Sequence, residues 1–206
     1  MSFVGQKCPQ IEGLIFIKGD AVAIPPAGKP AVLEFWASWC GPCRAAFPHL
    51  SDMARKQKDS GLVVLGINIE GDSPAVKKLV VDQGTRMDYT VAIDAGQQAS
   101  NKLMAAAGVS GIPFAFIVDS KGIIRHYGHP MDPKFGQMVS AVCSEAKVAA
   151  AAAAPKPVTQ TKEELAAMSV KELKAILDSW NISFADLNEK SELVERILER
   201  CCKNEN

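Results

Sequence analysis

The amino-acid sequence predicts an α/β fold, a central mixed sheet flanked by helices, followed by a small all-α domain. Residues 1 to 147 alternate strand patterns with helix patterns, as chains that build layered α/β sheets do. A run of alanines that ends in Pro155 and Pro157 then interrupts the pattern. Two helix-start signals follow close together. The 206 residues have room for one full core and a small appendage.

The elements of the first domain are expected in the order ββαβαβαββα. Short apolar runs indicate buried strands, and longer stretches that open on Ser or Pro indicate helices. The expected segments are two short strands within Gly13–Ile24, a strand over Ala31–Ala37, a helix from Pro42 to about Lys58, a strand over Leu62–Asn68, a helix from Pro74 to about Gln83, a strand over Tyr89–Ile93, a helix over Gln97–Ala107, a hairpin of Phe114–Val118 and Ile123–Tyr127, and a helix after Pro133.

The second domain begins after a linker. Alanines at 149–154 run into Pro155-Lys156-Pro157, and the prolines stop a helix and leave an extended spacer. Thr161–Glu164 and Ser169–Glu172 are capping boxes. Two apolar stripes follow, at Val170, Leu173, Ile176, Leu177 and Trp180 and at Leu193, Val194, Ile197 and Leu198. We expect a first domain over 1–147, a linker over 148–160 and a helical domain over 161–206.

Composition and charge exclude several classes of protein. The 23 basic and 23 acidic residues give a net charge of zero, so no overall basic field attracts nucleic acid or anionic lipid. The first residues lack the pattern of a secretory signal, and no apolar run approaches the ~20 residues that cross a bilayer. Four of the six cysteines lie outside any pairing pattern, unlike a secreted disulfide framework. A soluble, cytoplasmic protein that binds neither membrane nor nucleic acid is expected.

The strongest chemical signal is the pair Cys40 and Cys43 in the sequence WCGPC, residues 39–43. At a strand-to-helix junction, two sulfurs one helical turn apart can form a reversible disulfide. Cys40 would stand at the helix N-terminus, where free amides and the helix dipole lower a thiol pKa from ~8.5 toward ~7. Cys40 is therefore the expected nucleophile. Cys43, carried into the helix, is the expected resolving thiol.

Other interpretations of the pair are half of a zinc site or two buried thiols. A closed zinc site needs two more ligands, and no second Cys/Cys or Cys/His pair supplies them. His126 and His129 could share a metal, but isolated histidines are more often surface or core residues. Two cysteines with this spacing in a βαβ setting are a recognised redox signature. We expect a redox-active disulfide, with no metal and no cofactor.

Residues 35–43, FWASWCGPC, resemble the active-site strand and loop of the thioredoxin superfamily. The stretch from Ile69 to Gly108, which adds a helix and a strand before Gly111-Ile112-Pro113, is similar to the insertion of the TlpA/ResA-like and redoxin branch. The resemblance covers roughly residues 3–147. It implies a thioredoxin fold and dithiol-disulfide exchange, and it leaves the substrates open. The sequence does not identify the electron donor.

Glu34 is the candidate acid/base. A carboxylate in the middle of the apolar strand is costly unless it stays protonated or serves a purpose. The alternative is an edge-facing side chain whose head reaches water. Its place six residues before Cys40 matches the buried aspartate that, in thioredoxins, exchanges a proton with the second cysteine. Gly66 departs from the thioredoxins that carry a lysine in the neighbouring strand, so this proton circuit lacks a basic partner.

The resemblance also implies a substrate groove. In the family a cis proline ahead of a strand faces the dithiol, and Ile112-Pro113 is placed to match it. The expected groove is lined by Ile112 and Pro113 and, beside the dithiol, by Trp39, Gly41 and Pro42. Trp39 is expected to be a partly exposed contact residue and Trp36 a packing residue, although both could be core.

The C-terminal helices resemble the SAP-like domain, in particular the version at the C-terminus of mesencephalic astrocyte-derived neurotrophic factor. Phe184 and Leu187 stand where that version often carries two cysteines, so no second redox centre is implied. Residues 158–206 hold seven Lys/Arg and ten Asp/Glu, which opposes phosphate binding. We expect this module to contact a protein partner.

Three functions compete. The leading one is a reductase of cytosolic protein or peptide disulfides. The second is a thiol peroxidase of the redoxin type, although Ala37 stands three residues before Cys40, where a peroxidatic site usually has Thr. The third is a nucleic-acid or chaperone-binding adaptor in which the first domain is a scaffold. Reduction of insulin disulfides, peroxide consumption and gel-shift assays separate them.

Overall fold

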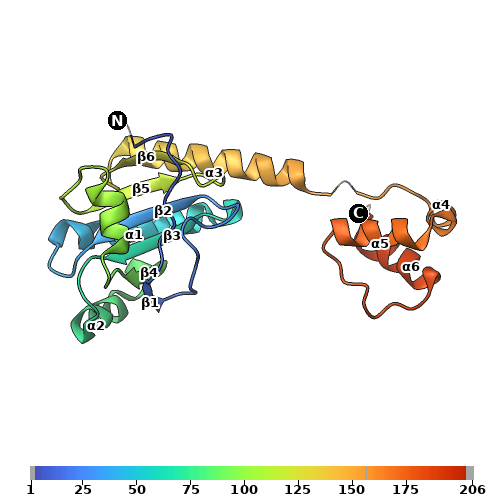
Figure 1. Ribbon diagram of the computed structural model, residues 1–206, viewed down its shortest axis with the longest axis horizontal. Coiled ribbons are helices and arrows are strands. Elements are labelled where there is room, and N and C mark those ends of the chain that lie inside the picture. The colour runs from blue at the N-terminus through green and yellow to red at the C-terminus, as the bar shows by residue number, and fades with distance from the viewer. Residues whose placement is uncertain (1–2, 156, 203–206) are drawn as a thin grey trace. The chain divides into compact units, whose positions relative to one another are not determined.

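The structure, a computed structural model, describes residues 3–155 and 157–202 (Figure 1). Contacts divide the chain into two compact units, Met1–Ala149 and Ala150–Asn206. Of the predicted domains and linker, residues 1 and 2, Lys156 and residues 203–206 lie outside the described part. The first unit is a mixed sheet flanked by helices, so the predicted α/β fold class is confirmed.

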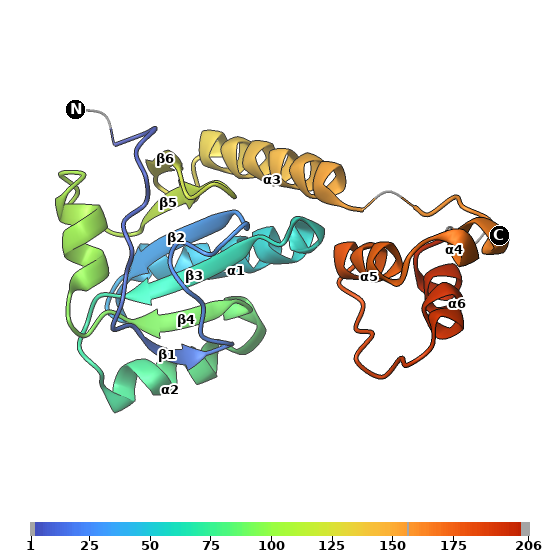
Figure 2. The same cartoon turned by 45° about the vertical axis from the view of Figure 1, so that its right-hand side comes forward.

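Six strands form one sheet in the spatial order β1-β4-β3-β2-β5-β6, and Figure 2 shows them side by side. Their bounds are β1 Ile15–Lys18, β2 Ala31–Trp36, β3 Val63–Asn68, β4 Thr90–Ile93, β5 Phe114–Val118 and β6 Ile124–Gly128. β2 runs parallel to β3 and antiparallel to β5. All six residues of β2 are buried, which explains why this strand reads as a nearly continuous apolar run.

The main helices of the first unit are α1 Gly41–Lys56, α2 Pro74–Gln83 and α3 Pro133–Ala153. Phe47 of α1, Val80 of α2 and Phe135 of α3 belong to one apolar cluster on one side of the sheet. The other side is covered by the N-terminal segment and the π-helical segment Ser100–Ala105. Because strand side chains alternate, the face of β2 that carries Val32 and Trp36 points into the cluster that contains α1.

Two predicted elements differ from the structure. The pair of strands expected within Gly13–Ile24 is wrong: in this part of the described chain β1 is the one named strand, and Ile24 makes an isolated bridge to Ile11. β1 pairs with the edge of β4 in place of a hairpin partner. The helix expected over Gln97–Ala107 forms as a π-helical segment, and Asp94 accepts hydrogen bonds from the amides of Ala99 and Ser100 at its start.

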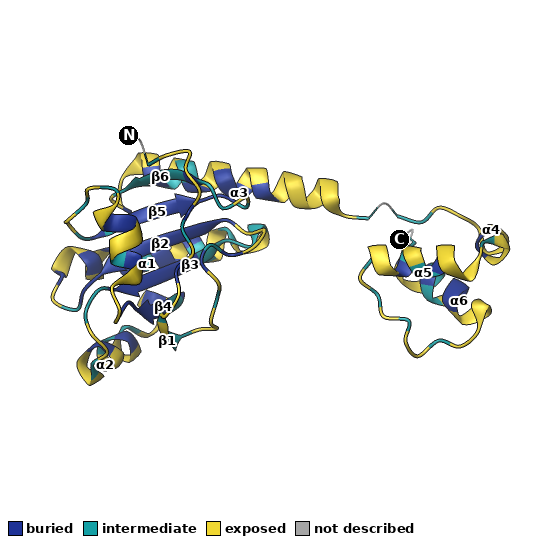
Figure 3. Cartoon of the chain, viewed as in Figure 1, coloured by how far each residue is buried: buried dark blue, intermediate teal, exposed yellow. Residues whose placement is uncertain are grey.

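The helix α3 continues to Ala153 and takes in the first residues of the range predicted as a linker. Alanine has the highest helix propensity, and the first proline after the run is Pro155. Residues 147–153 are exposed along this stretch (Figure 3). Within the described residues, no helix is both long and apolar enough to cross a membrane.

The second unit contains α4 Lys162–Ala167, α5 Val170–Ser179 and α6 Lys190–Arg200. Thr161 and Ser169 each complete a capping box, as the sequence predicts. The small core is formed by Leu165, Leu173, Leu177, Leu193, Val194, Ile197 and Cys201. Val170, which the predicted stripe included, is instead 43% exposed, because it is the first residue of its helix.

Candidate active site

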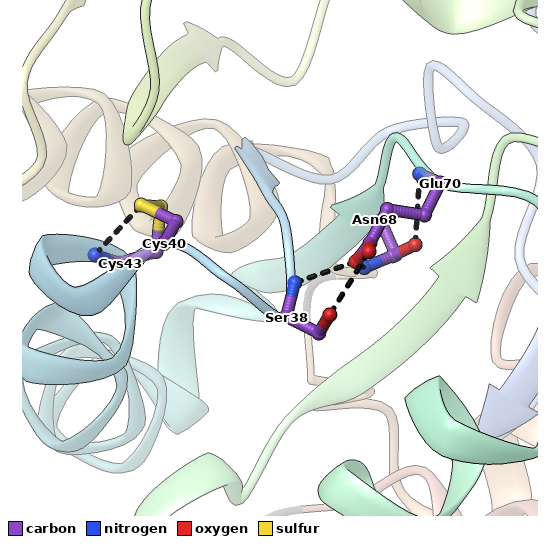
Figure 4. The surroundings of a disulfide bond; sticks show 5 residues. All are labelled: Ser38, Cys40, Cys43, Asn68 and Glu70. Atoms are coloured by element: carbon purple, nitrogen blue, oxygen red, sulfur yellow. Dashed lines mark hydrogen bonds between the residues drawn. A yellow bond between two sulfur atoms is a disulfide. The ribbon is translucent and has the colours of Figure 1, made fainter.

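The turn between β2 and α1 brings the two predicted redox cysteines together. Cys40 is the N-cap of α1, and Pro42 occupies the first turn, where its missing amide hydrogen removes no helical hydrogen bond. The Sγ atoms of Cys40 and Cys43 form a disulfide, and their Cα atoms are 5.3 Å apart (Figure 4). The backbone amide of Cys43 donates a hydrogen bond to Cys40 Sγ at 3.1 Å. One amide of the first helical turn therefore contacts one sulfur of the pair.

The two cysteines differ in accessibility. Cys43 is completely buried within the cluster that contains Phe47, whereas Cys40 keeps 4% of its surface exposed. Trp39, immediately before Cys40, is 69% exposed. Cys40 is thus the cysteine of the pair that keeps some exposed surface, beside the exposed Trp39 indole, whereas Cys43 keeps none.

The loop ahead of Cys40 is attached to the end of β3 by a carboxylate. Glu70 Oε2 accepts hydrogen bonds from the amide of Ser38 at 2.5 Å and from Asn68 Nδ2 at 3.1 Å, and Oε1 accepts one from Ser38 Oγ at 2.9 Å (Figure 4). Burial raises the pKa of Glu70, but these hydrogen bonds outweigh burial and leave the pKa below its usual value. The ionised Glu70 side chain therefore holds the loop that presents the dithiol.

Sequence reasoning missed Glu70. A usable signal was present, because Glu70 lies two residues beyond β3 and Ser38 two residues beyond β2. The two strands are parallel neighbours, so their carboxyl ends meet at one edge of the sheet. A carboxylate that follows one strand and a hydroxyl that follows the next can meet at that edge.

Glu34 is completely buried in the middle of β2, opposite Gly66 of β3 and Ala115 of β5. Neither carboxyl oxygen has a hydrogen-bond partner within the described part of the chain. The alternative in which its head reaches water does not hold. Burial raises the pKa of Glu34 well above the usual value, so the protonated form is favoured. Alternation along β2 puts the side chain on the face that carries Trp36 and the dithiol helix.

The residues of the expected groove come from two parts of the chain. Gly41 and Pro42 are exposed beside the disulfide. Ile112 is partly buried and packs against the cluster that contains both cysteines, and the bond between Ile112 and the buried Pro113 is cis. Ile112 and the dithiol thus share one cluster, although they are about 70 residues apart in the sequence.

The predicted alternatives to a redox site have little support in the geometry. Within residues 3–155 and 157–202, no three His, Cys, Asp or Glu side chains gather as metal ligands would. His126 packs its ring against Phe135, and burial lowers its pKa. His129 Nδ1 accepts a hydrogen bond from the amide of Met131. His126 and His129 therefore each have a contact of their own.

Fold and site together define a thioredoxin-fold protein with a disulfide at the start of its first long helix. Residues 4–127 match the family model "AhpC/TSA family", and because this match spans more than half of the chain, the protein belongs to the AhpC/TSA family. The first unit is also similar to the thioredoxin domain of a thiol-disulfide oxidoreductase from Bacteroides vulgatus, with a TM-score of 0.57 and 22% identity over 68% of this chain and 97% of that one.

Two curated relatives carry informative names. The thiol-disulfide oxidoreductase ResA of Bacillus thuringiensis (strain Al Hakam) is 33% identical over 95 residues, which are 46% of this chain and 51% of that protein. The thiol:disulfide interchange protein DsbE of Pseudomonas aeruginosa is 34% identical over 99 residues, 48% of this chain and 50% of that protein. The chain thus spans about half the length of the curated relatives it matches.

The second unit matches a different family model. Residues 159–199 match "E3 ubiquitin-protein ligase rififylin-like domain". The comparisons do not bear out the expected SAP-like domain, which stays a prediction.

Proposed function

We propose that this protein is a thiol-disulfide oxidoreductase that reduces disulfides of protein or peptide targets through Cys40 and Cys43. The observation that carries the proposal is the asymmetry of the pair. Cys40 Sγ lies at a helix N-terminus and accepts an amide hydrogen bond, which favours a thiolate once the disulfide is reduced. Cys43 has no exposed surface and suits a thiol that acts on a neighbouring sulfur alone. The names of the two curated relatives support the same chemistry.

The reaction balances in two steps. The Cys40 thiolate attacks one sulfur of the target disulfide, forms a mixed disulfide and releases the other target sulfur as a thiolate. Cys43 then loses its proton and attacks Cys40 Sγ, which closes the Cys40–Cys43 disulfide and releases the second target thiolate. The target gains two electrons and the protein loses two. An external dithiol must return two electrons for the next cycle.

Glu34 is the proposed acceptor of the Cys43 proton. As a carboxylate it takes the proton when Cys43 attacks, and in the oxidised protein it keeps that proton. The raised pKa of Glu34 supports this assignment, because the structure holds the disulfide form. When the disulfide is reduced again, the carboxyl group returns the proton to the Cys43 thiolate.

The target would lie over the exposed surface around the disulfide. Trp39 offers a large exposed apolar ring, and Gly41 and Pro42 are exposed beside the disulfide. Ile112 and Pro113 complete the proposed groove. Backbone groups of an extended target segment can pair with this loop without selecting a sequence, which fits a reductase with protein or peptide substrates.

The decisive experiment is reduction of insulin disulfides with dithiothreitol as the donor. The wild-type protein should accelerate insulin precipitation, Cys40→Ser should reduce the rate to that of dithiothreitol alone, and Cys202→Ser, a change at a free thiol, should leave it unchanged. Retained turnover by Cys40→Ser would refute the proposal. If the protein consumes peroxide at a higher rate than it reduces insulin disulfides, the result would favour the thiol peroxidase.

For the second unit we propose a protein-contact role, consistent with its excess of acidic over basic residues. We also propose that the second unit is a SAP-like domain and that the protein is cytoplasmic. Capture of targets on Cys43→Ser, compared between the full chain and a chain that ends at Lys147, tests the contact role. Identical captured sets would mean that the second unit does not select targets.

A further inference from the structure

Three polar side chains of the first unit meet in its core without hydrogen-bond partners. Both carboxyl oxygens of Glu34, the indole Nε1 of Trp36 and the hydroxyl of Tyr89 are buried, and within the described residues none of them has a partner. Glu34 and Trp36 are completely buried, and Tyr89 is 8% exposed. A buried polar group without a partner is unfavourable, so three at one place call for a common explanation.

Gly66 is the point around which these side chains gather. It lies opposite Glu34 in the parallel pairing of β2 and β3. A Cβ atom at Gly66 would stand 2.9 Å from Tyr89 Cε2, 3.3 Å from Trp36 Nε1 and 3.5 Å from Glu34 Oε2. The absence of a side chain at Gly66 therefore lets the tyrosine ring and the indole approach the carboxyl group. Burial, followed by the nearby charge of Glu34, raises the pKa of Tyr89 well above the usual value.

The chemistry of the three groups is complementary. An indole N–H can donate a hydrogen bond but cannot accept one, a phenol hydroxyl can donate, and a carboxylate only accepts. A protonated Glu34 carries no charge and has little need of hydrogen-bond donors. The indole N–H of Trp36 and the hydroxyl of Tyr89 then stay unpaired. When Glu34 is ionised, it becomes a buried charge that needs donors nearby, and charge-assisted hydrogen bonds are the strong ones.

We propose that Trp36 and Tyr89 are positioning residues that donate hydrogen bonds to the Glu34 carboxylate each time its proton leaves. This inference rests on the proposed function, in which Glu34 exchanges a proton with Cys43. The hydroxyl of Tyr89 and the indole N–H of Trp36 thereby set the pH above which Glu34 can act as a base. Both rings and the carboxyl group surround the same point, the place where a Gly66 Cβ would stand.

Few other titratable groups face Glu34. The strands on either side place Gly66 and Ala115 opposite it, and neither titrates. In the cluster that covers this face, Cys143 of α3 and Tyr89 titrate, and Cys40 and Cys43 of α1 titrate once their disulfide is reduced. His126 of β6 packs against Phe135 of the same cluster. Around Gly66, the groups beside Glu34 Oε2 that carry a hydrogen-bond donor are Trp36 and Tyr89.

The test compares Tyr89→Phe with Tyr127→Phe in the full chain. Each change removes one hydroxyl, and the chain has two tyrosines. The insulin reduction rate is measured from pH 6 to pH 9. In Tyr89→Phe, the rise of the rate with pH should move to higher pH by about one unit, because the Glu34 carboxylate loses a hydrogen-bond donor. On the acidic side of this rise, the rate should therefore be about tenfold lower than in the wild type. Tyr127→Phe should leave the profile unchanged. In a Glu34→Gln background, Tyr89→Phe should have no effect on the profile.

A second readout does not depend on activity. The infrared C=O band of protonated Glu34, assigned by its loss in Glu34→Gln, is titrated in the oxidised protein. The pH midpoint of this titration should be higher in Tyr89→Phe than in the wild type, and it should be unchanged in Tyr127→Phe. The inference is overturned if the infrared midpoint is unchanged in both variants. It is also overturned if Tyr89→Phe shifts the pH profile of the rate equally in the Glu34→Gln background, or if Tyr89→Phe fails to fold. A wild-type profile that Glu34→Gln does not alter would instead refute the proposed role of Glu34.

Discussion

Replacement of Glu34 by leucine should stabilise the oxidised protein, and the gain should grow with pH. In the protonated form, a buried carboxyl without partners costs roughly 1–3 kcal/mol compared with an apolar group of similar size. Leucine fills the same strand position between Gly66 and Ala115 and needs no hydrogen bond. We expect a gain of about 2 kcal/mol in the free energy of unfolding at low pH.

The pH dependence follows from the raised pKa of Glu34. Below the usual carboxyl pKa of 4.5, the group is protonated in both states and contributes no slope. As the pH rises above that value, the unfolded chain releases the proton while the folded chain retains it. Folding therefore loses about 1.4 kcal/mol for each pH unit until the raised folded-state pKa is reached. Leucine abolishes this loss, so its advantage increases through this range.

Urea unfolding of the oxidised protein between pH 4 and pH 8 measures both the gain in stability at low pH and its increase with pH. Glu34→Gln is the matched control, because it stays polar but cannot ionise. It should abolish the part of the pH dependence that Glu34 causes, without giving the gain at low pH. The reasoning is refuted if Glu34→Leu is less stable than the wild type at pH 7, or if its advantage over the wild type is the same at pH 5 and pH 8. Unequal m values would show that the unfolded states differ.

Three further predictions concern other parts of the molecule. Cys43→Ser should accumulate a mixed disulfide between Cys40 and the target, visible by mass spectrometry under non-reducing conditions, and normal turnover would contradict the role of Cys43. Glu70→Gln should lower stability by about 1 kcal/mol at pH 7, because a charged acceptor of the Ser38 loop is lost. Because the pKa of Glu70 is lowered in the folded protein, the difference in stability between the wild type and Glu70→Gln should be present above pH 4.5. It should disappear as the pH falls through the folded-state pKa of Glu70. A difference that stays constant with pH would show that the charge of Glu70 does not contribute to stability. A chain that ends at Lys147 should reduce insulin at the full-length rate, because Cys40, Cys43 and Glu34 precede that point. A large loss in steady-state rate would show that catalysis needs the second unit.

The parts of the fold that the sequence predicts well are those in which local signals agree with the tertiary structure. The α2 helix begins at Pro74 after a Ser73 cap and ends at Gln83, and the sequence predicts both boundaries. The two capping boxes at Thr161 and Ser169 are equally local. β1 is different, because its partner is β4, more than 70 residues away, and no local pattern specifies that edge.

The candidate site divides in the same way. The Cys40 and Cys43 spacing alone places two sulfurs within reach, and the structure shows them bonded. The burial of Glu34 follows from its apolar neighbours in β2. Glu70 and Tyr89 could not be assigned with the same ease, because their contacts depend on how β3 and β4 lie beside β2. A sequence pattern shows which residues share a strand, but pairing of strands decides which side chains face one another.

Stability and reactivity make opposite demands on the centre of β2. An apolar residue at position 34 would suit a strand whose other five residues are all buried and apolar. Neither neighbouring strand offers Glu34 a side-chain donor, since Gly66 and Ala115 lie opposite it. The carboxyl group is therefore held in an environment that favours its neutral form, and the donors within reach come from Trp36 and Tyr89. Such an arrangement weakens the fold at neutral pH, yet it raises the affinity of Glu34 for the single proton that Cys43 must lose before it can close the disulfide.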